Sequence, residues 1–112
     1  MTNKLCKPLL IDTIKATEKI EAHRFISFTG SFCNGNPKAY GVSEIDAEIG
    51  ELIPVAISGV LLVEAGGTIT VGDPVSAESK GRAIKAPDGA NINGYALDSG
   101  VFGDIIRIVR GI

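Results

Sequence analysis

The sequence predicts an all-β fold, a small β-sandwich or β-barrel with an extended N-terminal arm. Its 112 residues suffice for one domain with one core. The 14 glycines and 5 prolines interrupt the chain too often for long helices and favour short strands joined by tight turns. Hydrophobic residues make up 45% of the chain and aromatic residues only 5%, so we expect an aliphatic core.

The N-terminal arm is predicted over residues 1–10, and the single β domain over residues 11–112. The first eight residues show no periodicity, and Pro8 favours extended geometry in the residue before it. Residues 9–22 fit two patterns, because Ile14, Glu18 and Glu21 have roughly helical spacing whereas residues 9–13 alternate like a strand. We expect an extended segment followed by a polar turn.

From residue 24 onward the pattern is that of short strands separated by turn formers. The segments expected to hold strands are 24–29, 38–43, 51–58, 60–65, 66–77, 81–86, 92–99 and 103–110. This gives about eight to nine strands, the density typical of a sandwich or barrel. Ser58-Gly59 either closes a tight hairpin or marks a bulge in one long bent strand. Because proline cannot donate to a strand ladder, Pro54 indicates an edge strand or a bulge.

A weak internal repeat relates two parts of the chain. Gly41 and Gly50 have the same nine-residue spacing as Gly94 and Gly103, and an acidic residue with two aliphatic residues follows the second glycine of each pair. The pattern suggests two similar units, each a strand, a turn and a longer return strand, although chance similarity in a glycine-rich chain is an alternative. The residues expected to define turns are Gly59, Gly66, Gly72, Asp73, Gly81, Gly94 and Gly103.

Charge is distributed unevenly along the chain. The formal net charge is −2, and residues 25–78 carry seven acidic residues against Lys38 alone. Binding to nucleic acid needs a clustered basic face, so this acidic middle argues against a nucleic-acid partner. The longest uninterrupted apolar run, residues 60–63, is far too short to cross a bilayer, and the N-terminal residues lack a secretory signal pattern. We therefore expect no membrane partner.

The sequence lacks recognisable catalytic equipment. His23 is the single histidine, and Cys6 and Cys33 form no CxxC pair, so the usual zinc patterns and a disulfide framework are not expected. No GxSxG, phosphate loop or GxGxxG occurs. The four acidic residues within 44–51 lack the glycine and closing glutamate of a calcium loop and are interpreted as a solvated face. We expect no enzyme activity and no cofactor.

Several motifs, taken together, resemble the phage capsid cement, or head decoration, family of small β-rich virion proteins. The similarity covers about residues 22–112. The family pattern begins with a glycine, a Val-Glu-Ala-Gly motif and a Gly-Asp-x-Val turn. It continues with Gly-Arg-Ala, a Gly-x-Ala-Leu-Asp strand and a last apolar strand that contains arginine. The matching residues here are Gly59, Val63-Glu64-Ala65-Gly66, Gly72-Asp73-Pro74-Val75, Gly81-Arg82-Ala83, Gly94-Tyr95-Ala96-Leu97-Asp98 and Ile106-Arg107-Ile108.

The resemblance implies a structural virion protein, made in the host cytoplasm, that binds the outside of the phage capsid and cements major capsid protein subunits. It also implies a homo-oligomer, with a trimer favoured over a dimer. An arm without periodicity suits strand addition to a partner, so the candidate capsid contacts are Lys4, Leu5, Lys7, Pro8 and Leu9.

Two other functions stay open at this stage. One is a small binding module for a host receptor or a carbohydrate on the virion surface, for which Tyr40, Tyr95 and Phe102 are few aromatic residues. The other is an enzyme of unknown type, for which His23 with an acidic partner is the sole candidate.

Overall fold

The structure, a computed structural model, describes residues 5–34 and 38–111. Those residues form eight strands and no helix, so none of them forms a helix that could cross a membrane. The all-β prediction is confirmed. The strands are β1 (Lys7–Lys15), β2 (Phe25–Ile26), β3 (Gly41–Ser43), β4 (Leu52–Glu64), β5 (Pro74–Ala77), β6 (Ala83–Lys85), β7 (Gly94–Ala96) and β8 (Ile105–Arg110).

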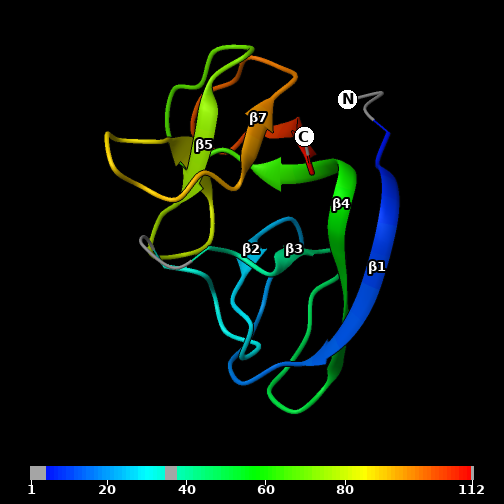
Figure 1. Ribbon diagram of the computed structural model, residues 1–112. Coiled ribbons are helices and arrows are strands. Elements are labelled where there is room, and N and C mark those ends of the chain that lie inside the picture. The colour runs from blue at the N-terminus through cyan, green and yellow to red at the C-terminus, as the bar shows by residue number, and fades with distance from the viewer. Residues whose placement is uncertain (1–4, 35–37, 112) are drawn as a thin grey trace.

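One antiparallel sheet joins these strands in the order β2-β3-β4-β8-β7-β5-β6, and β1 pairs with β4 outside this path. The sheet curls until its two ends meet, because the Phe25 N–H in β2 donates to the Gly81 carbonyl just before β6, at 2.7 Å. This closure makes the fold barrel-like. Figure 1 shows the long strand β4 running down one side of the molecule, with β1 along its outside.

A bulge in β4 lets this single strand serve two hydrophobic clusters. Ile53 and Val55 point into the smaller cluster, whereas Leu61 and Val63 point into the main one. In the pairing of β4 with β1, Ala56 and Ser58 both have partners, whereas residue 57 between them has none. One extra residue reverses the alternation of inward and outward side chains, so Ala56, Leu61 and Val63 share a face. Of the two alternatives for Ser58-Gly59, the long bent strand is the one observed.

The internal repeat corresponds to two similar hairpins. In the first, β3 pairs with the longer strand β4, and in the second β7 pairs with the longer strand β8. In both, the second glycine of the repeat lies in the connecting turn with a positive φ, 89° at Gly50 and 91° at Gly103. The predicted unit of strand, turn and longer return strand is therefore present twice.

The expected position of Pro54 in an edge strand or a bulge is wrong. Strand β4 has a neighbour on each side of Pro54, and Pro54 pairs with Thr13 of β1 in regular register. The Pro54 carbonyl accepts from the Glu44 N–H just past the end of β3. Because N and C=O of one antiparallel residue face the same neighbour, the proline nitrogen also faces Glu44, so the ladder bond that it cannot donate lies at the very end of the pairing between β3 and β4.

The predicted boundary between arm and domain falls inside a strand. Strand β1 begins at Lys7 and pairs with β4 from Lys7 to Lys15, so residues 7–10 belong to the sheet and not to a free arm. The first four residues lie outside the described part of the chain. Residues 17 and 18, shortly after β1, form a bend, in agreement with the polar turn expected there.

Gly59 is expected to tolerate no side chain. Its φ is 104°, and a Cβ there would lie 2.5 Å from the Lys7 carbonyl oxygen of β1. We expect Gly59→Ala to lower the free energy of unfolding by about 3 kcal/mol, through backbone strain together with displacement of β1. Gly50→Ala is the matched control, because Gly50 also has positive φ but has open space around it. It should cost only about 1 kcal/mol in urea unfolding. Equal losses for the two variants would contradict the steric argument.

Candidate functional site

The outer edge of β1 is the most distinctive free surface of the described chain. Strand β1 pairs with β4 alone, so its other edge carries backbone N–H and C=O groups without a strand partner. Leu9, Leu10 and Ile11 are exposed there, Leu9 to 85% of its surface. Leu9 is also the residue that bulges out of the pairing with β4. The edge thus offers both backbone groups and aliphatic side chains.

Charged residues and a proline bracket this apolar strip. Lys7 and Pro8 precede it, and Lys15 ends the strand. Lysine, proline and bulges are the devices that keep exposed strand edges from pairing indiscriminately. The free segment between them is therefore short, which suits a specific partner strand better than open-ended aggregation.

The residues predicted to contact a capsid lie in or beside this edge. Lys7, Pro8 and Leu9 form the first third of β1, and Leu5 is exposed just before the strand. Lys4 lies outside the described residues. Sequence reasoning missed two residues that continue the same exposed strip: Leu10, which lies in the predicted arm, and Ile11, which lies in the predicted domain body.

An aromatic pair lies next to β1. The rings of Phe28 and Tyr40 are 4.9 Å apart at 46°, and the Tyr40 hydroxyl donates to Asp12 of β1. That hydrogen bond lowers the pKa of the Asp12 carboxyl and raises the pKa of the Tyr40 hydroxyl. Phe28 remains exposed. This pair adds an aromatic flank to the candidate surface.

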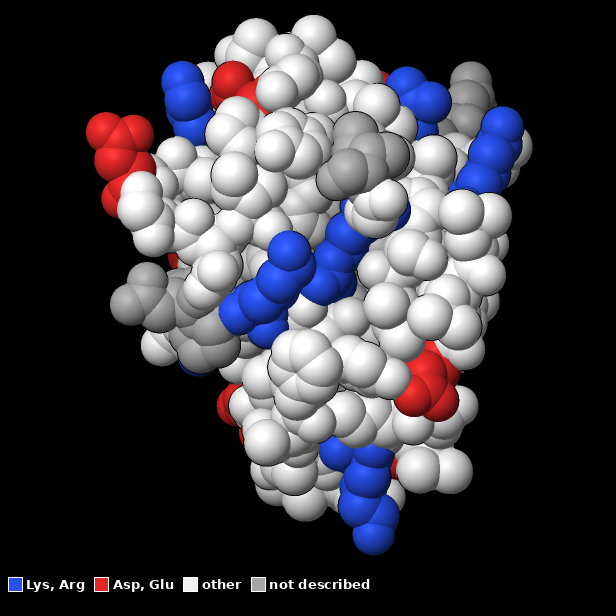
Figure 2. Space-filling view, in the orientation of Figure 1, with Lys and Arg blue, Asp and Glu red and all other residues white. Residues whose placement is uncertain are grey.

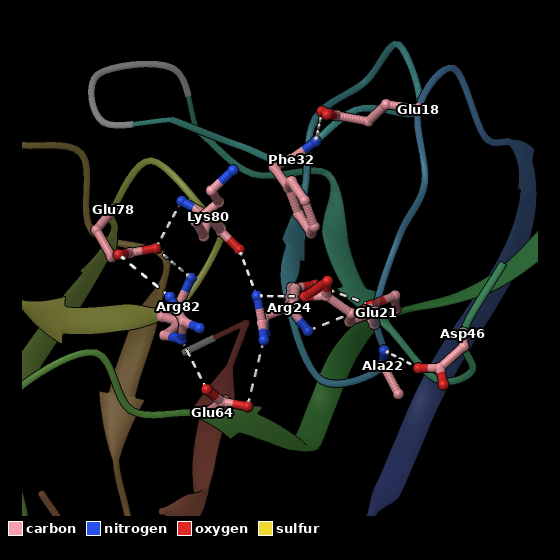
Figure 3. Close-up of polar contacts among 11 residues, drawn as sticks. Glu18, Glu21, Ala22, Arg24, Phe32, Asp46, Glu64, Glu78, Lys80 and Arg82 are labelled. Atoms are coloured by element: carbon pink, nitrogen blue, oxygen red, sulfur yellow. Dashed lines mark hydrogen bonds and ion pairs between the residues drawn. The ribbon is translucent and has the colours of Figure 1, made fainter. Parts of the chain in front are cut away.

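A network of ion pairs holds the two ends of the curled sheet together (Figure 3). Glu64, the last residue of β4, accepts from Arg82 Nε at 2.6 Å and lies 3.4 Å from Arg24 Nη2. The Arg24 side chain is nearly buried and also donates to the Lys80 carbonyl, at 3.1 Å. Arg24 precedes β2 and Arg82 precedes β6, so Glu64 bridges segments from opposite ends of the strand path.

Further carboxylates and one aromatic ring extend this network. Glu21 pairs with Arg24 at 2.9 Å, and Glu78 approaches Arg82 at 3.8 Å. The Phe102 ring lies 5.0 Å from the Arg82 guanidinium. The hydrogen bond to Glu64 is the main cause that raises the pKa of Arg82. Every described charge here pairs within the chain, which points to a structural role in closing the barrel.

Three turns of one design expose apolar side chains. Residues 48–51, 70–73 and 101–104 each place glycine third, with φ near 90°, and an acidic residue fourth. In each turn the fourth residue donates its N–H to the first carbonyl, and its carboxylate accepts the first N–H. The second position therefore points outward, and it is occupied by Ile49, Val71 and Phe102.

The residues predicted to define turns occupy several kinds of position. Gly72, Asp73 and Gly103 belong to two of these three turns, Gly59 follows the β4 bulge, and Gly81 precedes β6 with a φ of 76°. The other two are sites of close approach, because a Cβ at Gly66 would meet the Arg82 Cβ at 2.9 Å and one at Gly94 would meet the Val109 carbonyl oxygen at 3.0 Å.

The potentially reactive residues do not form a group that could hold a metal ion within the described chain. Cys6, His23 and Glu44 line one small pocket, but no group of three possible metal ligands is present among the described residues. Burial, followed by the hydrogen bond with Glu44, raises the pKa of the Cys6 thiol, which disfavours the reactive thiolate. Cys33 is buried in the main core. His23 has a φ of 64°, and its backbone groups bond to Ser43 and Glu64.

Residues 7–105 match the phage cement protein family. This chain belongs to that family. The resemblance predicted from the Val-Glu-Ala-Gly and Gly-Arg-Ala motifs is therefore confirmed, and with it a structural role in the phage virion. These motifs supply Glu64 and Arg82, the central pair of the network that closes the barrel.

The fold of this family member is also similar to a solved structure, described as the head fiber gp8.5 N base in bacteriophage phi29. The two share 22% sequence identity with a TM-score of 0.78, over 91% of this chain and 93% of that chain. No match was found among curated protein sequences. At this identity the similarity concerns the fold, which extends over nearly the whole of both chains.

Proposed function

We propose that this cement protein binds the outer surface of the phage capsid and stabilises contacts between major capsid protein subunits. The observation that carries the proposal is the free edge of β1, with its exposed Leu9, Leu10 and Ile11, in a member of the cement family. An extended segment of the capsid protein would add to this edge as a further strand. Backbone hydrogen bonds would supply affinity and the aliphatic side chains would supply register.

The proposed assembly on the capsid is a homo-oligomer, a trimer in preference to a dimer, made in the host cytoplasm before it joins the virion. Several copies linked in one oligomer would engage neighbouring capsid subunits together, so modest contacts at each β1 would give firm attachment. Analytical ultracentrifugation of the purified protein is expected to give a trimer mass. A monomer or dimer at micromolar concentration would contradict this part of the proposal.

Reconstitution tests the proposed function directly. Purified protein is added to expanded capsids that lack it, and binding is followed by co-sedimentation. We expect saturable binding and a rise in the temperature at which the capsids disassemble. Capsids that take up no protein, or that bind it without any gain in stability, would contradict the proposal. Heat-denatured protein is the control for non-specific adsorption.

A second candidate function is binding of a host receptor carbohydrate from the virion surface. The exposed Phe28 beside Tyr40, whose hydroxyl bonds to Asp12, favours it, because aromatic faces next to a carboxylate suit the apolar and polar sides of a sugar. A glycan array is the test. Binding lost in Phe28→Ala would support a sugar site, and an array without hits would remove it.

A further inference from the structure

A hollow of about 130 Å³ lies between the start of β7, the end of β8 and the segment before β3. Its lining includes Lys38, Asn93, Tyr95 and Arg110, which come from three separate parts of the chain. None of the described acidic residues lines it. In Figure 2 basic side chains gather in the middle of the molecular face shown, and the acidic side chains visible there lie apart from them.

Asn93 leaves a hydrogen-bond donor unused beside this hollow. Its side chain is fully buried, and its Oδ1 accepts the Ala39 N–H at 2.9 Å. Because a backbone N–H requires an acceptor, this contact fixes the orientation of the amide and makes Nδ2 a donor. Nδ2 is buried and has no acceptor among the described protein atoms. A buried donor without an acceptor is unfavourable, and native proteins contain few of them.

Arg110 provides the second unused donor. Its Nη2 donates to the Ala39 carbonyl, whereas Nη1 is buried and has no acceptor among the described protein atoms. Neither Arg110 nor Lys38 makes an ion pair with a described carboxylate. By contrast, Arg24, Arg82 and Arg107 each pair with a carboxylate of the described chain. The hollow therefore combines two cations and an amide donor without a counter-charge.

We propose that this hollow binds the carboxylate of an acidic side chain from a partner protein. A carboxylate carries negative charge and only accepts hydrogen bonds, which complements a lining of donors, and the planar guanidinium of arginine matches it geometrically. The volume suits a carboxylate with its adjoining methylene groups. A nucleic-acid phosphate is a poorer fit, because neutralising a phosphate backbone needs a basic surface and residues 25–78 are strongly acidic.

The site is separate from β1, and its ligand chemistry does not depend on attachment to a capsid. If the partner is the capsid protein, the hollow would add a charge-assisted contact to the strand addition proposed for β1. Because the test below uses the isolated protein and small probes, it can fail while the capsid-binding proposal stands. Likewise, acetate can bind to the hollow even if the protein does not bind capsids.

The first test is a titration of the 15N-labelled protein with sodium acetate, followed by NMR. We expect saturable shifts of the Asn93 side-chain amide and of Arg110 Nε, beyond those caused by sodium chloride at equal ionic strength. Lys38→Met should weaken acetate binding about fivefold, as expected for one exposed charge. Lys85→Met is the matched control, because Lys85 is exposed and does not line the hollow. It should leave acetate binding unchanged.

The substitution Asn93→Asp is a stronger test of carboxylate binding at this site. Aspartate keeps an oxygen acceptor for the Ala39 N–H, and it also places a negative charge among the lining donors beside Arg110. We expect acetate binding to be lost while the NMR spectrum retains the dispersion of a folded protein. If this variant does not fold, the Lys38→Met comparison still decides the test.

Further arms of the experiment identify the source of the carboxylate. A short neutral-ended peptide with one glutamate should shift the same signals more than its glutamine analogue, and inorganic phosphate should compete no better than chloride. The proposal is overturned if acetate causes no saturable shift, if chloride reproduces the acetate shift, or if phosphate binds where acetate does not. Equal effects of the glutamate and glutamine peptides would overturn a protein side chain as the ligand.

Discussion

Replacing Glu64 with glutamine is expected to lower the free energy of unfolding by about 3 kcal/mol, because it leaves a buried and a partly buried arginine without their shared carboxylate. Glu64 contacts Arg82 at 2.6 Å and Arg24 at 3.4 Å, and the Arg24 side chain is only 7% exposed. Glutamine keeps the size of the side chain and one acceptor oxygen, so the change isolates the charge. Urea unfolding followed by far-ultraviolet circular dichroism measures the loss.

The comparison with an ion pair whose arginine is more exposed makes this expectation specific. Arg107 pairs with Asp98 at 2.9 Å, but its side chain is 40% exposed, so Arg107→Gln should cost less than about 1 kcal/mol. A double-mutant cycle of Glu64→Gln with Arg82→Gln should give a coupling energy of about 1–2 kcal/mol. If Glu64→Gln costs no more than Arg107→Gln, the network does not hold the ends of the sheet together.

The pairing within this network could not be predicted from the sequence. Glu64 and Arg82 were both recognised as parts of motifs, yet they are 18 residues apart and occur with other charged residues. Their contact depends on the sheet curling until β6 returns to the end of β4, which local patterns do not specify. The strand segments were predictable for the opposite reason, because turn residues and alternation act over a few neighbours.

Strand β1 shows where alternation is an incomplete signal, because the alternation over residues 9–13 does not reveal a strand that begins at Lys7. The sequence of residues 7–10 looks like an unstructured arm, because an apolar–polar alternation arises only when one face of a strand is buried. Residues 9–13 are exposed on both faces of β1, and the bulge at Leu9 disturbs the alternation further. The segment therefore pairs with β4 through its backbone while its side chains carry little information about burial. Exposed apolar residues in such a strand indicate a surface for a partner.

The combined variant Leu9→Ser, Ile11→Thr is expected to weaken binding to capsids by about 100-fold or more. Each aliphatic side chain buried at an interface contributes about 1.5–3 kcal/mol, and loss of two such contributions corresponds to at least this factor. Both residues are exposed in the isolated chain, and threonine is well accommodated in strands, so the fold should lose less than about 1 kcal/mol. Co-sedimentation with capsids that lack the protein measures the affinity.

A control variant at two other exposed apolar residues distinguishes binding through the β1 edge from non-specific hydrophobic adhesion. Ile49 and Phe102 are 71% and 64% exposed at the tips of two turns outside β1. The variant Ile49→Thr, Phe102→Ser removes comparable apolar surface, so it should bind capsids within about threefold of the unaltered protein if β1 carries the contact. Equal weakening by both double variants would indicate adhesion without a defined edge. Undiminished binding by the Leu9→Ser, Ile11→Thr variant would move the contact away from β1, because strand addition there cannot proceed without placing a partner against these two side chains.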